Sequence, residues 1–533
     1  MSADNDVPRR DTIPAMTAAA AEQFGDLVAI IDGDTTLTFA ELYDEALYDE
    51  ARTFGAAVVA SGIEPGDRVS IWAPNSVEWV IAVLGLWQAG AVLVPINTRF
   101  KGAEAADLLS RGRAKLLVTV TDFLDTDYVA MLRATGIALP DLETIVVARG
   151  KAPEGTESWA GFLARATDDA RVDVARRAAG VHPEDPADIL FTSGTTGRPK
   201  GVVQTHSRTL VVATDWPAMT GLTTGDKYLM VNPYFHMFGL KAGILACVSV
   251  GATMLPEPVL DVGRALQRIA DEKVTCLPGA PTLFQSILEH PDRDRYDLSS
   301  LRTATIGAAD IPVALIRRIL DELPYRVLIS GYGLTEGGTA AGTAPDDDAE
   351  TIATTVGWAR PTFELRLVDQ GGNDVAAGEA GEIVLRGASV MLEYLDDPEA
   401  TADTLSPDGW LKTGDLGQFT DAGCLRIVGR VKDMYIVGGF NAYPAEIENV
   451  LLGHPEIQQV AVIGIPDERL GEVGMAFVVL RPGSTSTADA VIAWAREQMA
   501  NYKVPRAVEL VEELPLNATG KVMKDALRER AVR

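Results

Sequence analysis

The stretch "TSGTTGRPKGVVQTH", residues 192–206, follows the apolar run "DILF", which is typical of a buried strand. A helix is expected to begin after it, near Ser207. A glycine- and hydroxyl-rich loop after a strand lets backbone N–H groups and hydroxyls converge on an anion, and Lys200 adds positive charge. The pattern differs from the P-loop of NTPases, because its glycines are three residues apart and Pro199 precedes the lysine. By itself the stretch favours a phosphate-binding loop over an irregular turn.

Size, charge and cysteine content restrict the class of protein. A chain of 533 residues is too long for one ordinary core, so two or more domains are expected. The formal net charge of -28 disfavours nucleic acid and anionic lipid as partners. Three widely spaced cysteines and a polar N-terminus indicate a cytoplasmic protein without a signal peptide. The apolar run 77–96 contains Glu78 and Gln88, which favour a buried helix and strand over a membrane span.

Alternating helical and strand-like patterns up to about residue 430 predict an α/β fold with largely parallel sheets. Short strands and Gly/Asp turns from about 355 to 431 predict a small β-rich subdomain. A compact α+β pattern follows "GRVKDMYIVGG". We therefore predict a large N-terminal domain of layered α/β subdomains over 1–431 and a small C-terminal domain over 432–533.

Two further segments offer groups suited to a nucleotide. "GYGLTEGG", residues 331–338, places Thr335 and Glu336 just after a glycine-rich strand end. The hydroxyl can contact a phosphate, and the carboxylate suits Mg²⁺, a hard cation that prefers oxygen ligands. "GWLKTGD" places Asp415 after a turn, where its carboxylate can accept two ribose hydroxyls.

The last third of the chain adds basic and flexible positions. "GRVKDMYIVGG" supplies Arg430 and the glycine pair Gly438 and Gly439, and "NATGK" presents Lys521 on a turn. Taken singly, each of these segments is better explained by turn chemistry or surface charge than by ligand binding.

Together, and in this order, the motifs resemble the adenylate-forming superfamily of acyl-CoA synthetases, firefly-type luciferases and peptide-synthetase adenylation domains. The resemblance runs from "TFAEL" near residue 38 to "NATGK", with a mild variation at Lys524, where many relatives carry arginine. It implies an AMP-forming ligase that joins a carboxylic acid to CoA through an acyl-AMP intermediate. It also implies that ATP and CoA are substrates, that Mg²⁺ is required and that the C-terminal domain is mobile.

The resemblance implies a role for each motif residue. Lys521 and Thr335 would act at the carboxylate and the α-phosphate, Glu336 would bind Mg²⁺, His236 would gate the acyl channel, and Lys432 would be the hinge. The residues expected to bind ATP or CoA are Thr192, Ser193, Gly194, Thr195, Thr196, Gly197, Lys200, Gly331, Tyr332, Gly333, Asp415, Arg430, Gly438 and Gly439.

The acyl substrate is less constrained. No Asp-containing stretch like that of peptide synthetases occurs near His236, which favours a simple carboxylic acid over an amino acid. "HMFGLKAGILAC", "TCLPGAPTLFQSILEHP" and "KDMYIVGGFNAYPAEIE" resemble actinobacterial acyl-CoA ligases of steroid ring C/D catabolism. Those enzymes activate the propanoate arm of a bicyclic indanedione, which is therefore the expected substrate.

Several alternatives stay open at this point. The acid could be a medium-chain fatty or aryl acid, and the enzyme could stop at the acyl-adenylate or act as a luciferase-like monooxygenase. Outside the family, a non-catalytic nucleotide-binding protein or an ADP-releasing kinase or ATPase remains. Arg469, Lys503 and Arg506 are candidates for binding the CoA phosphates. A homodimer and acetylation of Lys521 are consistent with the resemblance.

Overall fold

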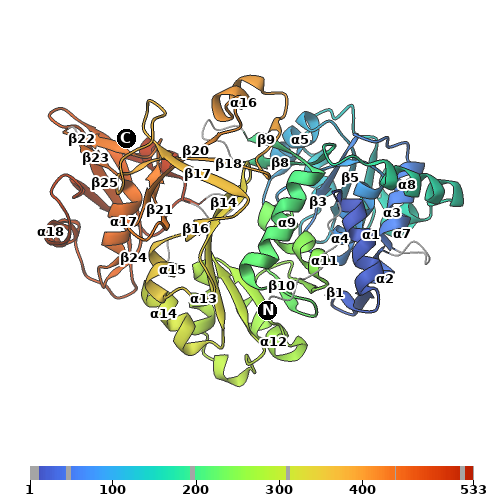
Figure 1. Ribbon diagram of the computed structural model, residues 1–533, viewed down its shortest axis with the longest axis horizontal. Helices are drawn as coiled ribbons and strands as arrows, with labels where there is room; N and C mark the ends of the chain where they lie inside the picture. Colours follow the sequence, from blue (N-terminus) through green and yellow to red (C-terminus); the bar gives the residue numbers. More distant parts are fainter. Residues whose placement is uncertain are drawn as a thin grey trace. The chain divides into compact units, whose positions relative to one another are not determined.

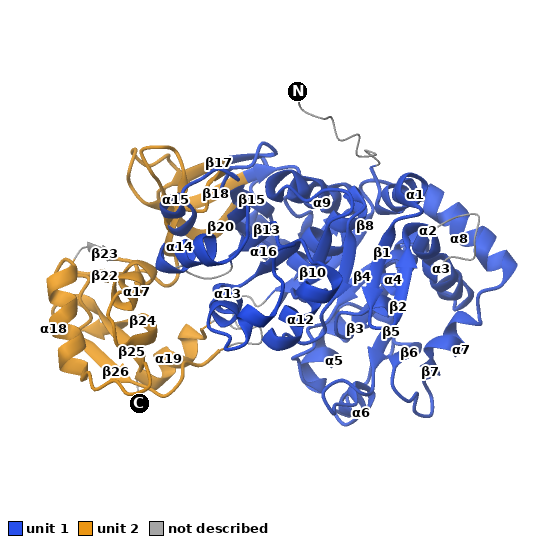
Figure 2. Cartoon of the chain, turned by 90° about the horizontal axis from the view of Figure 1, so that it is seen from below, with its two compact units in different colours: residues 1–353, 359–364, 386–411 blue, residues 354–358, 365–385, 412–533 orange. Residues whose placement is uncertain are grey.

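The computed structural model describes residues 11–43, 50–192, 199–307, 313–438, 440–516 and 522–531. The chain divides into two compact units (Figure 2). Unit 1 comprises Met1–Ala353, Ala359–Glu364 and Arg386–Leu411, and unit 2 comprises Thr354–Trp358, Leu365–Leu385 and Lys412–Arg533. Residue 432, the predicted boundary between the N-terminal and C-terminal domains, therefore lies within unit 2. That the chain moves as two domains about this residue stays a prediction.

Two large sheets form the framework of unit 1 (Figure 1). The eight-stranded sheet has the order β19 (Glu393–Tyr394), β9 (Lys200–Thr205), β8 (Pro186–Thr192), β4 (Val92–Pro95), β3 (Arg68–Trp72), β5 (Ala114–Val120), β6 (Thr144–Arg149) and β7 (Glu157–Ser158). The nine-stranded sheet has the order β16 (Trp358–Ala359), β15 (Gly338–Gly342), β14 (Val327–Leu334), β13 (Thr303–Ile306), β12 (Cys276–Gly279), β10 (Lys227–Met230), β11 (Thr253–Pro256), β1 (Val28–Asp32) and β2 (Thr35–Thr38).

Helices connect the central strands of both sheets, whose neighbours from β3 to β8 and from β1 to β14 pair in parallel. The helices up to residue 250 are α1 (Ile13–Phe24), α2 (Phe39–Tyr43), α3 (Glu50–Ala60), α4 (Val77–Gln88), α5 (Gly102–Arg111), α6 (Tyr128–Arg133), α7 (Trp159–Leu163), α8 (Asp168–Gly180), α9 (His206–Thr220), α10 (Met237–Gly239), the π-helix η1 (Leu240–Leu245) and α11 (Ala246–Val250). Those that follow are α12 (Val262–Glu272), α13 (Pro281–Leu288), the 3₁₀ helix η2 (Arg293–Arg295), α14 (Val313–Glu322), α15 (Ala349–Thr354) and α16 (Pro398–Thr404). The prediction of an α/β fold is confirmed.

Antiparallel strands dominate the sheets that follow. One sheet has the order β17 (Phe363–Val368), β18 (Gly381–Gly387), β20 (Leu411–Phe419) and β21 (Leu425–Arg430). Another contains β22 (Tyr435–Val437), β23 (Phe440–Ala442), β24 (Ile457–Asp467), β25 (Gly471–Leu480) and β26 (Ala507–Leu510), with α17 (Pro444–Leu452), α18 (Ala488–Gln498) and α19 (Lys524–Ala531).

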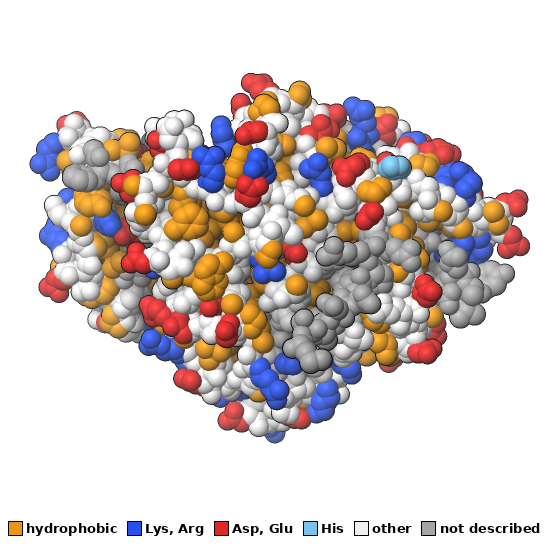
Figure 3. All heavy atoms as spheres, viewed as in Figure 1, with side chains coloured by type: hydrophobic (Ala, Val, Ile, Leu, Met, Phe, Trp, Pro, Cys, Tyr) orange, Lys and Arg blue, Asp and Glu red, His pale blue; other side chains and the backbone are white. Residues whose placement is uncertain are grey.

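The apolar run 77–96 forms α4 and β4 in the main core of unit 1. Glu78 is accommodated there because it pairs with Arg149 at 2.8 Å. Within the part of the chain that the structure describes, no helix is long and apolar enough to cross a membrane. On the face drawn in Figure 3, acidic and basic side chains are interspersed.

Candidate active site

The hairpin of β8 and β9 positions the two ends of the glycine-rich loop. Thr192 pairs with Lys200 in the antiparallel register of these strands. Arg111 holds the loop end, since its Nη1 donates to the Pro199 carbonyl at 2.7 Å and its guanidinium lies 5.0 Å from the Phe191 ring centroid. The predicted phosphate-binding residues Ser193, Gly194, Thr195, Thr196 and Gly197 lie outside the described residues.

A second hairpin, of β14 and β15, presents Thr335 and Glu336 in its turn. Leu334 pairs with Gly338 across the hairpin, and Gly338 has a φ of +83°, which favours glycine. The residues predicted to line the nucleotide, Gly331, Tyr332 and Gly333, are in β14. α9 packs against this hairpin (Figure 1), and a Cβ on Gly342 would lie only 2.3 Å from the Met219 sulfur.

Tyr394 joins the two hairpins. Its strand, β19, pairs antiparallel with β9, which places its ring 4.7 Å from the Nζ of Lys200. Its hydroxyl donates a hydrogen bond of 2.9 Å to Oε1 of Glu336. The structure thus brings Lys200 and Glu336 to one place through a tyrosine that the sequence analysis did not identify.

Burial fixes the protonation state of this tyrosine. Tyr394 is 6% exposed. Burial, and then the Glu336 carboxylate, raise its pKa well above the usual range. The hydroxyl stays protonated at neutral pH and donates its hydrogen to Glu336 Oε1. A cation over the ring of Tyr394 and a carboxylate at its hydroxyl are suited to a metal-bound polyphosphate.

Gln204 fixes the turn of the second hairpin from β9. Its Nε2 donates to the carbonyl oxygens of Thr335, at 3.4 Å, and Ser389, at 3.2 Å. The Ser389 hydroxyl in turn donates to the Gly337 carbonyl at 2.7 Å. These bonds to Thr335 and Gly337 go to backbone carbonyl oxygens, so they hold the backbone of the turn and leave the Thr335 hydroxyl out of these contacts.

His236 caps a short helix at the predicted acyl side. Its Nδ1 accepts a hydrogen bond of 3.2 Å from the N–H of Phe238, and the residue is exposed. The Phe238 ring meets Trp216 of α9 edge-on, with centroids 5.1 Å apart. The chain then enters η1, and π-helical turns are frequent at functional sites.

In unit 2 the structure brings Asp415 and Arg430 together. They are cross-strand partners on β20 and β21, and Arg430 Nε lies 2.9 Å from Asp415 Oδ1. Asp415 is buried, and its N–H donates to Thr413 Oγ1 at 3.1 Å. The pair presents a carboxylate, which accepts hydrogen bonds, and a guanidinium, which donates them, side by side.

The other predicted positions of unit 2 fall into two groups. Lys432 lies in an exposed turn before β22, and Gly438 has a φ of +56°. Gly439 and Lys521 lie outside the described residues. Lys524, the position at which many relatives carry arginine, forms an ion pair with Glu448 at 2.7 Å.

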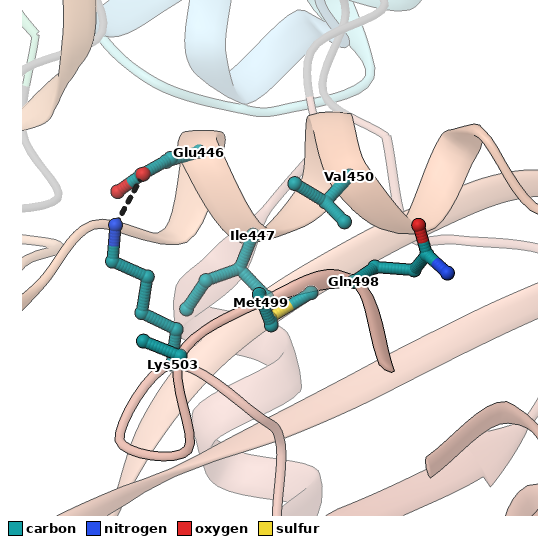
Figure 4. Close-up of a pocket in the computed structure, with 7 residues that line it drawn as sticks. Glu446, Ile447, Val450, Gln498, Met499 and Lys503 are labelled. Atoms are coloured by element: carbon teal, nitrogen blue, oxygen red, sulfur yellow. Dashed lines mark hydrogen bonds and ion pairs between the residues drawn. The ribbon is translucent and has the colours of Figure 1, made fainter. Parts of the chain in front are cut away.

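A pocket of about 230 Å³ lies between α17 and the segment after α18 (Figure 4). At one end Lys503 forms an ion pair with Glu446, and Ile447 and Met499 line the space between them and Gln498. The Glu446 carboxylate raises the pKa of Lys503 against the effect of burial. A lysine already paired with a carboxylate is a weaker candidate for binding a CoA phosphate than the sequence alone indicated.

The residues present fit Mg²⁺ bound through substrate. In the ranges that the structure describes, no three His, Cys, Asp or Glu side chains are grouped to hold a metal ion. Mg²⁺ commonly uses one or two carboxylates together with substrate phosphates and water. Glu336, held in place by Tyr394 beside Lys200, fits that arrangement.

Comparison with known proteins identifies the family of this chain. The AMP-binding enzyme model matches residues 17–395, and the AMP-binding enzyme C-terminal domain model matches residues 446–521. The chain belongs to the AMP-binding enzyme family. The predicted resemblance is thereby confirmed.

Curated relatives and solved structures share nearly the full length of this AMP-binding enzyme. The 3-[(3aS,4S,7aS)-7a-methyl-1,5-dioxo-octahydro-1H-inden-4-yl]propanoyl:CoA ligase of Rhodococcus jostii (strain RHA1) is 48% identical, over 97% of this chain and 98% of the relative. The ligase of the same name from Mycobacterium tuberculosis (strain ATCC 25618 / H37Rv) is also 48% identical, with the same coverage. The anthranilate CoA ligase AuaEII, solved with anthranoyl-AMP, superposes with a TM-score of 0.86 at 30% identity, covering 99% of both chains.

Proposed function

We propose that this protein is an ATP-dependent acid–thiol ligase for the propanoate side chain of a methylated dioxo-octahydroindene. The reaction joins the acid to CoA and releases AMP and pyrophosphate. The observation that carries the proposal is the 48% identity, over 97% of the chain, to two ligases named for that acyl group. The cytoplasm, where ATP and CoA are available, is the expected compartment.

In the first step the acid's carboxylate attacks the α-phosphorus of ATP and pyrophosphate leaves. A carboxylate is ionised at neutral pH, so no general base is needed. The requirements are alignment and charge stabilisation, which Lys200, Thr335 and Lys521 would supply at the phosphates and the carboxylate. Glu336, oriented by Tyr394, would hold Mg²⁺, which when bound offsets phosphate charge.

In the second step the CoA thiol attacks the acyl carbonyl and AMP leaves. Asp415 and Arg430 would retain the ribose during both steps. Lys432 would allow the C-terminal domain to turn, and Gly438 and Gly439 would border the thiol's path. Residues 432–533 are thus proposed as the mobile domain, and a homodimer stays a prediction.

The alternative acids have weaker support. Feruloyl-CoA synthase of Amycolatopsis sp is 37% identical over 94% of this chain, so an aryl acid is the second candidate.

A product assay tests the proposal. The protein would be incubated with Mg²⁺, ATP and a panel containing the indanedione propanoate, ferulate, anthranilate and octanoate, with and without CoA. Mass spectrometry is expected to detect acyl-CoA and AMP with the indanedione acid. The Lys521→Ala variant, which should still bind ATP, controls for contaminating ligases.

Any other result of the assay would show which part of the proposal is wrong. If ferulate or octanoate were activated with a higher kcat/KM than the indanedione acid, that acid would become the proposed substrate instead. Acyl-AMP alone in the presence of CoA would indicate an adenylate-only enzyme, and ADP would contradict the reaction class.

A further inference from the structure

Lys241 and Asp188 form a fully buried ion pair in unit 1. Their exposed fractions are 1% and 0%, and Lys241 Nζ lies 3.0 Å from Asp188 Oδ1. The other carboxylate oxygen, Oδ2, accepts a hydrogen bond of 2.8 Å from Thr209. Burial lowers the pKa of Lys241, and the Asp188 carboxylate opposes that effect.

Stability alone does not explain such a pair. Removing two charges from water costs several kcal/mol per ion, and well-packed apolar replacements are often neutral or stabilising. A buried pair does, however, fix the geometry of the elements that carry it. Its place in the fold therefore indicates what it does.

The pair connects three elements, each adjacent to a proposed substrate-binding segment. Asp188 is on β8, which leads into the glycine-rich loop, and Thr209 is on α9, which follows β9, the strand after that loop. Lys241 is in η1, which directly follows the His236 segment and contacts α9 and α10.

Buried polar side chains also lie between this pair and the second hairpin. Asp188 is the cross-strand partner of Gln204, so their side chains share one face of the sheet. Gln204 donates to the carbonyl of Thr335. A row of buried polar groups thus runs from η1 to the turn that carries Thr335 and Glu336.

We propose that Lys241 is a positioning residue of the ligase reaction. Its ion pair with Asp188 fixes η1, and with it the His236 segment, against the hairpin that carries the phosphate loop. The carboxylate of the acid is thereby held in line with the α-phosphate. This inference rests on the proposed function, because it assigns the acid to the η1 side and the nucleotide to the hairpin.

The experiment compares three variants with the wild type. Lys241→Met/Asp188→Asn removes both charges and keeps the shape of both side chains. Thr209→Val, which removes a hydrogen bond to Asp188 and leaves both charges paired, is the second variant if the double variant is unstable. Lys115→Met/Asp67→Asn is the control, because it removes a Lys–Asp ion pair of unit 1 outside the proposed site, with a 2.7 Å separation and side chains 35% and 20% exposed.

Acyl-AMP formation, KM for acid and ATP, and thermal midpoint would be measured with whichever acid the wild type activates best. We expect the Lys241 double variant to lose about tenfold to a hundredfold in kcat, as misalignment of reacting groups does. KM for the acid should rise, whereas KM for ATP should stay close to that of the control variant.

A double variant whose kcat matches that of the control pair, with only a lower thermal midpoint, would make the ion pair purely structural and overturn the inference. Equal increases in KM for acid and ATP would also overturn it. If the wild type activates no acid of the panel, the proposed function itself is wrong and the inference falls with it. The two failures are therefore distinguishable.

Discussion

Tyr394 joins the two hairpins that carry the proposed phosphate site. It is held between a lysine and a glutamate that are 136 positions apart in the sequence, Lys200 and Glu336. Its ring and its hydroxyl make separate contacts, so their contributions can be measured separately.

Replacing Tyr394 with Phe should weaken use of Mg²⁺ and ATP while leaving the fold intact. The variant loses a hydrogen bond to a charged group, worth about 1.5–3 kcal/mol, or roughly tenfold or more in kcat/KM for ATP. Tyr394→Leu also removes the ring beside Lys200 and should lose more.

Steady-state kinetics over a range of Mg²⁺ concentrations would check this prediction. Tyr325→Phe is the control, since this buried hydroxyl has no hydrogen-bond partner among the described residues. Identical kinetics for Tyr394→Phe and the control would show that the Glu336 contact is unimportant.

His206 is a residue whose effect depends on pH. It is 1% exposed, its Nδ1 accepts the Ile13 N–H at 3.4 Å, and burial lowers its pKa to about 4. Above pH 6.5 this histidine is neutral in both folded and unfolded chains. As the pH falls from about 6.5 toward 4, only the unfolded chain gains the proton, so up to about 3 kcal/mol of stability is lost.

In the His206→Asn variant this position carries no titratable group, so the variant should lack the loss of stability that His206 causes at low pH. We expect the difference in thermal midpoint between wild type and variant to shift in the variant's favour between pH 7.5 and pH 5. Scanning calorimetry at several pH values would measure it, and a constant difference would contradict the assignment.

At the scale of elements, the hairpin of β14 and β15 positions Thr335 and Glu336. Its turn has no room for a side chain at Gly338, where a Cβ would lie 2.7 Å from Ser389 Oγ and 2.8 Å from Val212 Cγ2. The φ of +83° adds strain for any other residue. Packing and backbone conformation therefore both fix this turn.

Gly338→Ala should lower stability by about 1–3 kcal/mol and raise KM for ATP, because the turn must move. Gly225→Ala is the control, since its φ of +82° gives similar strain while nothing lies within 4 Å of its Cβ. A lower thermal midpoint and higher KM only in Gly338→Ala would be the expected result. Equal effects would mean that strain alone matters.

At the scale of the whole molecule, the two proposed half-reactions need different positions of the C-terminal segment. Lys432 lies in the exposed turn after β21, where a change in φ would redirect everything that follows. The proposed motion therefore depends on very few backbone angles.

Lys432→Pro restricts φ and should block transfer to CoA while sparing adenylation. Acyl-AMP formation is expected to stay near the wild-type rate, and thioester formation should fall by about tenfold or more. Asp421→Pro, in the exposed turn closed by Gly423 N–H to Thr420, is the matched control. Equal loss of both half-reactions would contradict the hinge.

The sequence predicted the family, the α/β fold and the candidate motifs, because each motif is a short contiguous segment with its own turn chemistry. Glycines and hydroxyls around 192–200 and at 331–338 mark loops after strands whatever the rest of the chain does. Tyr394 had no comparable signal, since "LEYLDDPEAT" indicates only a short strand and a helix that starts at Asp397-Pro398. Its role depends on β19 pairing with β9.

The sequence by itself determined which groups are available for chemistry: the glycine-rich loop, Thr335, Glu336, Asp415 and the basic residues. Local composition and spacing suffice for that. Only the tertiary structure decided which groups meet, namely Lys200, Tyr394 and Glu336 in unit 1, Asp415 and Arg430 in unit 2, and the buried Lys241–Asp188 pair. The physical reason is that strand pairing and burial join residues distant in sequence, and no local pattern encodes which strands become neighbours.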